Sequence, residues 1–119
     1  GEDWMTVTIY HNPRCSKSRQ TLALLEARGV SPVIVEYLKT PPSADDLKAI
    51  LKKLGLKPQD IVRTKEARYA ELALKERSVL DDELLALLSE NPILIERPIV
   101  VAGKKAAIGR PPETVLAIL

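Results

Sequence analysis

The only cysteine of this chain, Cys15, stands where an extended segment gives way to a helical one. The run 6–10 is rich in β-branched residues, His11-Asn12-Pro13 interrupts it, and a helical pattern begins near Ser16. Unpaired backbone N–H groups in the first turn of a helix, together with the helix dipole, favour a thiolate over a thiol. This position therefore predicts a nucleophilic cysteine.

The residues around Cys15 strengthen this interpretation. Arg14, Lys17 and Arg19 place three positive charges near the thiol in sequence. In such surroundings a cysteine pKa can fall from about 8.5 to roughly 3.5–7.5. The alternative is a buried and inert cysteine, which is common in proteins. Three neighbouring cations argue against burial, so we predict a reactive thiolate.

Two further side chains could assist the thiol. A cationic His11, four residues before Cys15, would lower the thiol pKa further. The equal alternative is that His11 only makes a hydrogen bond that shapes the turn, or is simply exposed. The hydroxyl of Ser18 could donate a hydrogen bond to the thiolate or to a bound anion, although serine is also common at helix starts.

Three arginines lie beside structural breaks in the sequence. Arg63 follows an apolar pair, Arg97 precedes a proline and an apolar run, and Arg110 lies between a glycine and two prolines. The planar donor fork of arginine suits tetrahedral oxyanions, and three such forks around one thiolate would hold a dianion for attack. Taken alone, each arginine is better explained as a solvated surface residue, and sequence spacing does not show that the three converge.

Length and composition favour one domain, residues 1–119, built on an aliphatic core with 45% hydrophobic residues and no phenylalanine. The net charge of +2 is too small for a general nucleic-acid or membrane surface. A single cysteine excludes an internal disulfide and a cysteine zinc site. We expect no metal, a cytoplasmic location and a monomer. Residues 1–5 are expected to be flexible. Met5 is expected to be the native start, so residues 1–4 would be partly non-native.

The pattern of apolar residues predicts the order β-α-β, a helical block, then β-β-α. The predicted strands cover 6–10, 33–38, 98–102 and 106–108, and a crossover helix between the first two makes them parallel. Predicted helices start at Ser43, near Pro58, at Asp81 and at Pro111. This is an α/β chain with the thioredoxin-like order, a mixed central sheet and a helical insertion.

Three sequence segments together carry a resemblance to a known family. HNPRCSKSR at 11–19, ERPIVV at 96–101 and IGRPPETV at 108–115 resemble the arsenate reductases that work with glutathione and glutaredoxin, in particular a bacterial branch with this cysteine motif. The similarity extends in the same order from Thr6 to the C-terminus.

The resemblance implies a thioredoxin-like fold in which Cys15 is the catalytic residue and His11 assists its thiolate. It also implies a cis bond at Arg97-Pro98. The remaining site residues that it implies are Ser18, as a further catalytic residue, and an oxyanion-binding set of Arg19, Arg63, Arg97 and Arg110.

The implied reaction is attack of Cys15 on arsenate, followed by glutathione as co-substrate and glutaredoxin as the protein that clears Cys15. The lone cysteine fits this scheme, because a chain without a second thiol must borrow one. Ser16-Lys17 replaces the smaller pair of well-studied resistance enzymes, which puts the substrate in question. Two alternatives stay open, namely an RNA polymerase-binding regulator of the same fold and a thiol transferase with another substrate.

Overall fold

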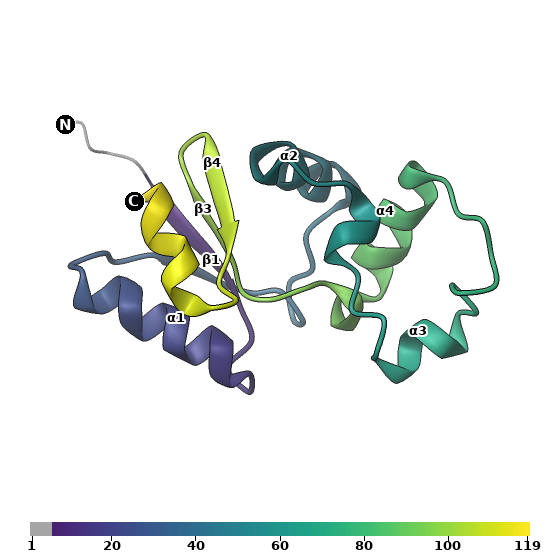
Figure 1. Cartoon of the computed structure of the whole chain (residues 1–119), viewed down its shortest axis with the longest axis horizontal. Helices are drawn as coiled ribbons and strands as arrows, with labels where there is room; N and C mark the ends of the chain where they lie inside the picture. The colour runs from purple at the N-terminus through teal and green to yellow at the C-terminus, as the bar shows by residue number, and fades with distance from the viewer. Residues whose placement is uncertain (1–5) are drawn as a thin grey trace. The chain divides into compact units, whose positions relative to one another are not determined.

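The computed structural model describes residues 6–119, so the expectations for residues 1–5 lie outside the described part. Its contacts group the chain into two compact units, which are described separately (Figure 1). Unit 1 contains residues 6–40 and 97–119, and unit 2 contains Pro41–Glu96.

Unit 1 is built on a mixed four-stranded sheet in the order β2-β1-β3-β4. Strands β1 and β2 are parallel, because helix α1 forms the crossover between them, and β3 runs antiparallel to both β1 and β4. This confirms the α/β, thioredoxin-like arrangement predicted from the sequence. The bounds are β1 Val7–His11, α1 Ser16–Ala27, β2 Val33–Glu36, β3 Ile99–Ala102 and β4 Lys105–Ile108.

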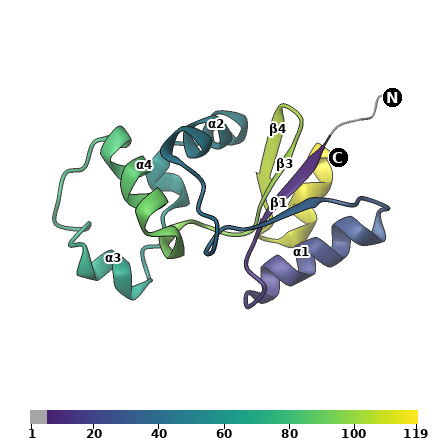
Figure 2. The same cartoon turned by 180° about the vertical axis from the view of Figure 1, so that it is seen from behind.

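One face of this sheet carries the core of unit 1. Helix α1 and the C-terminal 3-10 helix η3, Pro112–Ile118, lie on the same side of the sheet in both views (Figures 1 and 2). Burial of their apolar side chains against the sheet removes them from water, which is the main force that holds these layers together. The buried cluster contains Val7, Ile9, Leu25, Val100, Ala102 and Val115.

Unit 2 is helical, as the middle of the sequence predicts. Its elements are α2 Ala44–Leu54, η1 Pro58–Ile61, α3 Ala67–Glu71, α4 Asp81–Glu90 and η2 Pro92–Leu94. Ser43 and Asp46 form the predicted capping box, with Asp46 N–H donating to Ser43 Oγ at 3.0 Å. Gly55 ends α2 with a φ of +70°, a left-handed conformation that glycine adopts without strain.

Several predicted bounds differ from the structure. Strand β2 ends at Glu36 rather than at residue 38, because the N–H groups of Lys39 and Thr40 both turn back to the Glu36 carbonyl. The C-terminal helix is a 3-10 helix rather than an α-helix. The predicted cis bond at Arg97-Pro98 is confirmed, and Arg110-Pro111 is a second cis bond.

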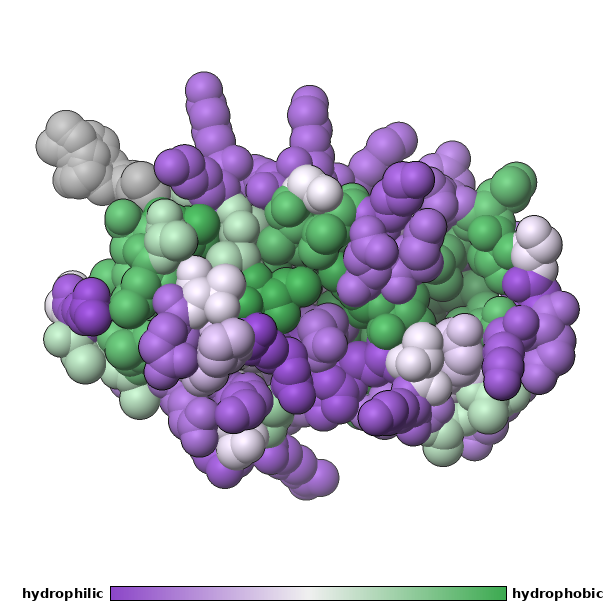
Figure 3. All heavy atoms as spheres, in the orientation of Figure 1, coloured by the Kyte–Doolittle hydropathy of each residue, from purple (hydrophilic) through white to green (hydrophobic). Residues whose placement is uncertain are grey.

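The surface mixes residue types over both units. Figure 3 shows hydrophilic side chains interspersed with apolar patches on the visible face. Among the described residues, no helix is long and apolar enough to cross a membrane.

Candidate functional site

The loop between β1 and α1 places Cys15 at the start of the helix. Cys15 N–H donates to the Asn12 carbonyl at 3.0 Å, which closes a tight turn, and Arg19 N–H donates to the Cys15 carbonyl as the first helical bond. Cys15 is thus the N-cap residue of α1, and the first turn contains no acidic residue. The positive end of a 12-residue helix therefore acts on the thiol.

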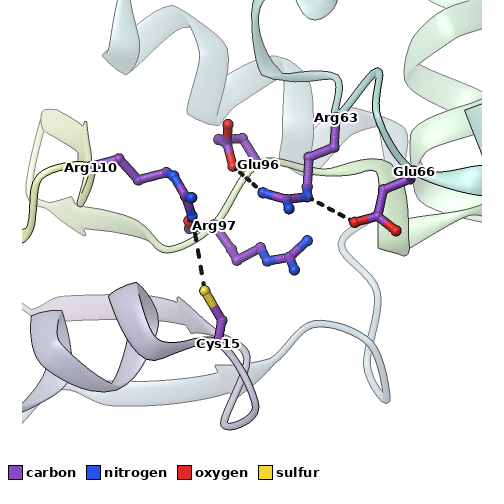
Figure 4. A network of polar contacts seen from close by, with 6 residues as sticks. All are labelled: Cys15, Arg63, Glu66, Glu96, Arg97 and Arg110. Carbon is purple, nitrogen blue, oxygen red and sulfur yellow. Dashed lines mark hydrogen bonds and ion pairs between the residues drawn. The ribbon is translucent and has the colours of Figure 1, made fainter.

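Two of the predicted arginines reach this thiol within unit 1. Arg110 Nη1 lies 3.9 Å from Cys15 Sγ and donates to the Arg97 carbonyl at 3.1 Å (Figure 4). The Arg97 side chain, with its positive charge, also favours the thiolate form of Cys15. The structure therefore brings together Cys15, Arg97 and Arg110, which come from opposite ends of the sequence.

Close packing at Gly109 fixes the segments that carry these arginines. Gly109 N–H donates to the Pro98 carbonyl at 2.9 Å. A Cβ at Gly109 would lie 2.9 Å from Pro98 Cγ and would overlap Thr21 Oγ1 of α1. Only glycine allows this approach, so helix α1 is joined directly to the residues next to Arg97 and Arg110.

The pKa of Cys15 lies below its ordinary value of 9.0. Burial is the largest single influence and raises the pKa. It is outweighed by the Ser18 backbone N–H, the Arg97 side chain, the Lys17 backbone N–H and the charge of Arg97, all of which favour the thiolate. The sequence predicted that unpaired backbone N–H groups in the first helical turn favour the thiolate, and the amides of Lys17 and Ser18 are two such groups.

His11 is a buried structural partner of the loop. Its side chain is 6% exposed, and Nδ1 lies 2.6 Å from Ser18 Oγ. Ser18 Oγ also accepts a hydrogen bond from Asn12 N–H at 3.0 Å. Burial lowers the pKa of His11 most; Glu36 raises it and Arg19 lowers it, and the net direction is downward from 6.5. A neutral imidazole at pH 7 follows, which favours the hydrogen-bonding alternative over the cationic one.

The remaining contacts of the loop brace its backbone. Asn12 Oδ1 accepts from Arg14 N–H at 2.9 Å, and Arg19 Nη1 donates to the Pro13 carbonyl at 3.0 Å. Ser18 is fully buried against His11 and Asn12, so its hydroxyl is engaged in the loop. Arg19 and Ser18 were both predicted to act on the thiolate or the anion. The contacts that their side chains make hold the loop in shape, and the predicted roles stay predictions.

The third predicted arginine, Arg63, belongs to unit 2. Its Nη1 donates to Glu96 Oε1 at 2.7 Å, and its Nε donates to Glu66 Oε2 at 3.2 Å (Figure 4). The guanidinium is 23% exposed, and its own backbone N–H donates to the Leu94 carbonyl at 2.7 Å. Two carboxylates therefore fix the orientation of Arg63 and offset its charge, which sequence spacing did not indicate.

Residues 6–119 contain no group of three acidic, histidine or cysteine side chains placed to hold a metal ion. A half-buried thiolate beside two arginines and a helix N-terminus instead suits an oxyanion. The arrangement can bind a tetrahedral anion and present its central atom to sulfur.

Comparisons with known proteins identify the family of the chain. Residues 10–118 match the model of the ArsC family. A relative named arsenate reductase, from Haemophilus influenzae, is 53% identical over 97% of this chain and 100% of its own length. A relative from Escherichia coli K12, printed as uncharacterized protein YfgD, is also 53% identical, over 95% of this chain and 96% of its own.

A solved structure named arsenate reductase from Vibrio cholerae has the same fold. It superposes with a TM-score of 0.93 at 52% sequence identity and covers 97% of this chain and 98% of its own.

Proposed function

Because this chain belongs to the ArsC family, we propose that it is an arsenate reductase in which Cys15 is the nucleophile and glutathione and glutaredoxin supply the reducing electrons. The observation that carries the proposal is the lowered pKa of a thiol beside Arg97 and Arg110. The dependence on external thiols is supported by the single cysteine of the chain.

The first step joins sulfur to arsenic. Arg97 and Arg110 hold the anion, and Sγ attacks arsenic while one As–O bond breaks. The departing oxygen leaves as water, with protons taken from the substrate and the thiol. The product is a covalent Cys15–arsenate adduct of unchanged As(V) oxidation state. The arginines and the helix N-terminus act on the negative charge that builds on the arsenic oxygens.

The second step reduces arsenic. The glutathione sulfur attacks Cys15 Sγ, the S–As bond breaks, and its electron pair stays on arsenic. As(V) becomes As(III) and leaves as arsenite with the thiol proton, while the two sulfurs become a mixed disulfide. A glutaredoxin thiolate then attacks the glutathione sulfur and releases Cys15. A leaving thiol of low pKa speeds that exchange.

Other predicted site residues receive distinct roles. We assign His11 and Ser18 as positioning residues, because their mutual hydrogen bond and the Asn12 amide fix the loop before Cys15. Arg19 holds the Pro13 carbonyl. Arg63 remains a predicted anion ligand, and the arsenate KM of Arg63→Lys tests that role.

A coupled assay tests the function. Arsenate-dependent NADPH oxidation is followed with glutathione, glutathione reductase and glutaredoxin, and wild type is compared with Cys15→Ser. Gln20→Ala, an exposed change on the same helix, is the matched control and should retain full activity. Loss of activity in Cys15→Ser alone is expected, and wild-type turnover no higher than that of the variant would refute the proposal.

The same assay separates the thiol transferase alternative. NADPH oxidation driven by a low-molecular-weight disulfide, with no response to arsenate, would assign Cys15 to disulfide exchange instead. Capture of RNA polymerase subunits by a chain inactive in both assays would favour the regulator.

A further inference from the structure

A cavity in unit 1 lies on the loop that leads into Cys15. Its volume is about 190 Å³, and its walls are residues 11–14 and three residues that follow or end β2, namely Glu36, Leu38 and Lys39. Arg14, which lines it, is bonded directly to Cys15 in the chain. Neither Arg97 nor Arg110 lines this cavity. It is therefore a separate place beside the nucleophile.

The walls carry both signs of charge close together. Lys39 Nζ lies 3.4 Å from Glu36 Oε1, and these side chains are 80% and 41% exposed. An exposed ion pair of this kind contributes little stability. Glu36 and Lys39 can therefore leave each other and contact a ligand at a small cost in free energy. Arg14, a second basic residue, also lines the cavity, and Leu38, 40% exposed, adds an apolar residue.

This pattern fits one end of a zwitterionic peptide. An α-amino-acid head carries an ammonium group, which suits Glu36, and a carboxylate, which suits Lys39 and Arg14. The methylenes that follow the head in a γ-glutamyl group suit Leu38. A cavity of about 190 Å³ is below the roughly 300 Å³ of whole-ligand pockets, so it suits one end of a tripeptide rather than all of it.

The geometry also suits the reach of the thiol. The Cα atoms of Arg14 and Cys15 are neighbours, about 3.8 Å apart along the chain. Two residues of extended chain span roughly 7 Å, which is longer than the separation of these two Cα atoms.

We propose that this cavity binds the γ-glutamyl end of glutathione through Glu36, Lys39 and Arg14, and so places the reducing thiol beside Cys15. The inference rests on the proposed function, which requires an external thiol. The two substrates then bind at different places according to charge. Arg97 and Arg110 bind the oxyanion beside Sγ, and the mixed-charge cavity binds the zwitterionic end of glutathione. No covalent bond forms or breaks in this cavity.

The single histidine of the chain provides a direct probe. His11 lines the cavity, and Glu36 raises its pKa. A ligand ammonium that engages Glu36 should therefore lower the His11 pKa further. Imidazole nitrogen NMR shifts report this change without interference from any other histidine.

The binding test uses S-methylglutathione, which can neither attack the adduct nor form a disulfide. In an NMR titration, the His11 ring and the amides of Arg14 and Lys39 should shift and saturate together. N-acetyl-S-methylglutathione lacks the ammonium group and should bind about three- to tenfold more weakly, as one charged contact is lost. Shifts confined to the amides near Arg97 and Arg110, or equal binding of both probes, would overturn the proposal.

Matched variants connect binding to turnover. Lys39→Gln should raise the glutathione KM about three- to tenfold while kcat and the arsenate KM stay unchanged. Lys105→Gln, an exposed lysine elsewhere in unit 1, should change none of them. An unchanged glutathione KM in Lys39→Gln refutes the cavity while arsenate reduction stands. Saturable S-methylglutathione binding at this cavity by a chain that does not reduce arsenate refutes the reaction and supports the cavity.

Discussion

Replacement of Arg110 by glutamine should raise the pKa of the Cys15 thiol by about 0.8. The guanidinium Nη1 lies 3.9 Å from Sγ, and Arg110 is exposed, so the dielectric constant of water applies. At that distance two unit charges interact by about 1 kcal/mol. One pKa unit corresponds to about 1.4 kcal/mol, which converts this interaction to about 0.8. Arg97→Gln should have a larger effect, because Arg97 contributes both a hydrogen bond and a charge.

Thiolate absorbance at 240 nm, followed against pH, measures this pKa. Cys15 is the only cysteine, so the signal belongs to it alone. Arg28→Gln removes the same charge from beyond the far end of α1, which spans 12 residues and hence roughly 18 Å. This control should leave the pKa unchanged, because that distance exceeds the screening length of about 10 Å in 0.1 M salt.

Two results would refute the electrostatic reasoning. One is an Arg110→Gln pKa equal to that of wild type at low salt. The other is a difference that persists at 1 M salt, where the screening length falls to about 3 Å and an exposed charge pair should be strongly weakened.

Ser18→Ala leaves the buried His11 Nδ1 and the Asn12 amide without their shared hydrogen-bond partner. It should lower the free energy of unfolding by about 1–3 kcal/mol in urea titrations, and an unchanged urea midpoint would contradict this expectation. Gly109→Ala forces a Cβ into Pro98 and should cost about 1–3 kcal/mol in the same assay, with wild-type stability as the contrary result. Because the folded pKa of His11 lies below 6.5, the unfolded chain binds its proton first as pH falls. The stability from neutral His11 is therefore full above pH 6.5 and declines below it, and His11→Gln should flatten the fall in urea midpoint between pH 7.5 and 5.5. A slope as steep as that of wild type would exclude His11 as its source.

Local signals in the sequence were sufficient where one short segment determines its own structure. Ser43 with Asp46 predicted the start of α2, Gly55 its end, and the acidic residues at Asp81 the start of α4. Each signal involves groups within about one helical turn of each other, so no distant residue can change it. The parallel direction of β1 and β2 followed from the crossover helix, a constraint of chain geometry.

Bounds set by tertiary bonding were not predictable in this way. The apolar pattern of 33–38 continues past Glu36, yet two backbone N–H groups turn back to the Glu36 carbonyl and end the strand there. For His11, one signal was present and unused. Val7 and Ile9 are buried, and His11 is the next residue on the same face of β1, so strand periodicity indicated a buried, neutral imidazole.

The sequence predicted which residues form the candidate site better than it predicted the contacts that they make. Cys15, Arg97 and Arg110 meet as expected, which required the fold of unit 1 to join both ends of the chain. The pairing of Arg63 with Glu96 spans 33 positions, and sequence spacing carries no information about such a pair.

The close approach at Gly109 has a consequence for how folding can be observed. Cys15 belongs to the first 40 residues of the chain. Arg97 and Arg110, which lie beside the thiol, and Gly109, which packs against α1, all follow a 56-residue insertion, Pro41–Glu96. Until this late segment docks on α1, the thiol lacks the charges of Arg97 and Arg110. The alkylation rate of Cys15 therefore reports the assembly of unit 1. This rate should increase only when β3 and β4 are in place.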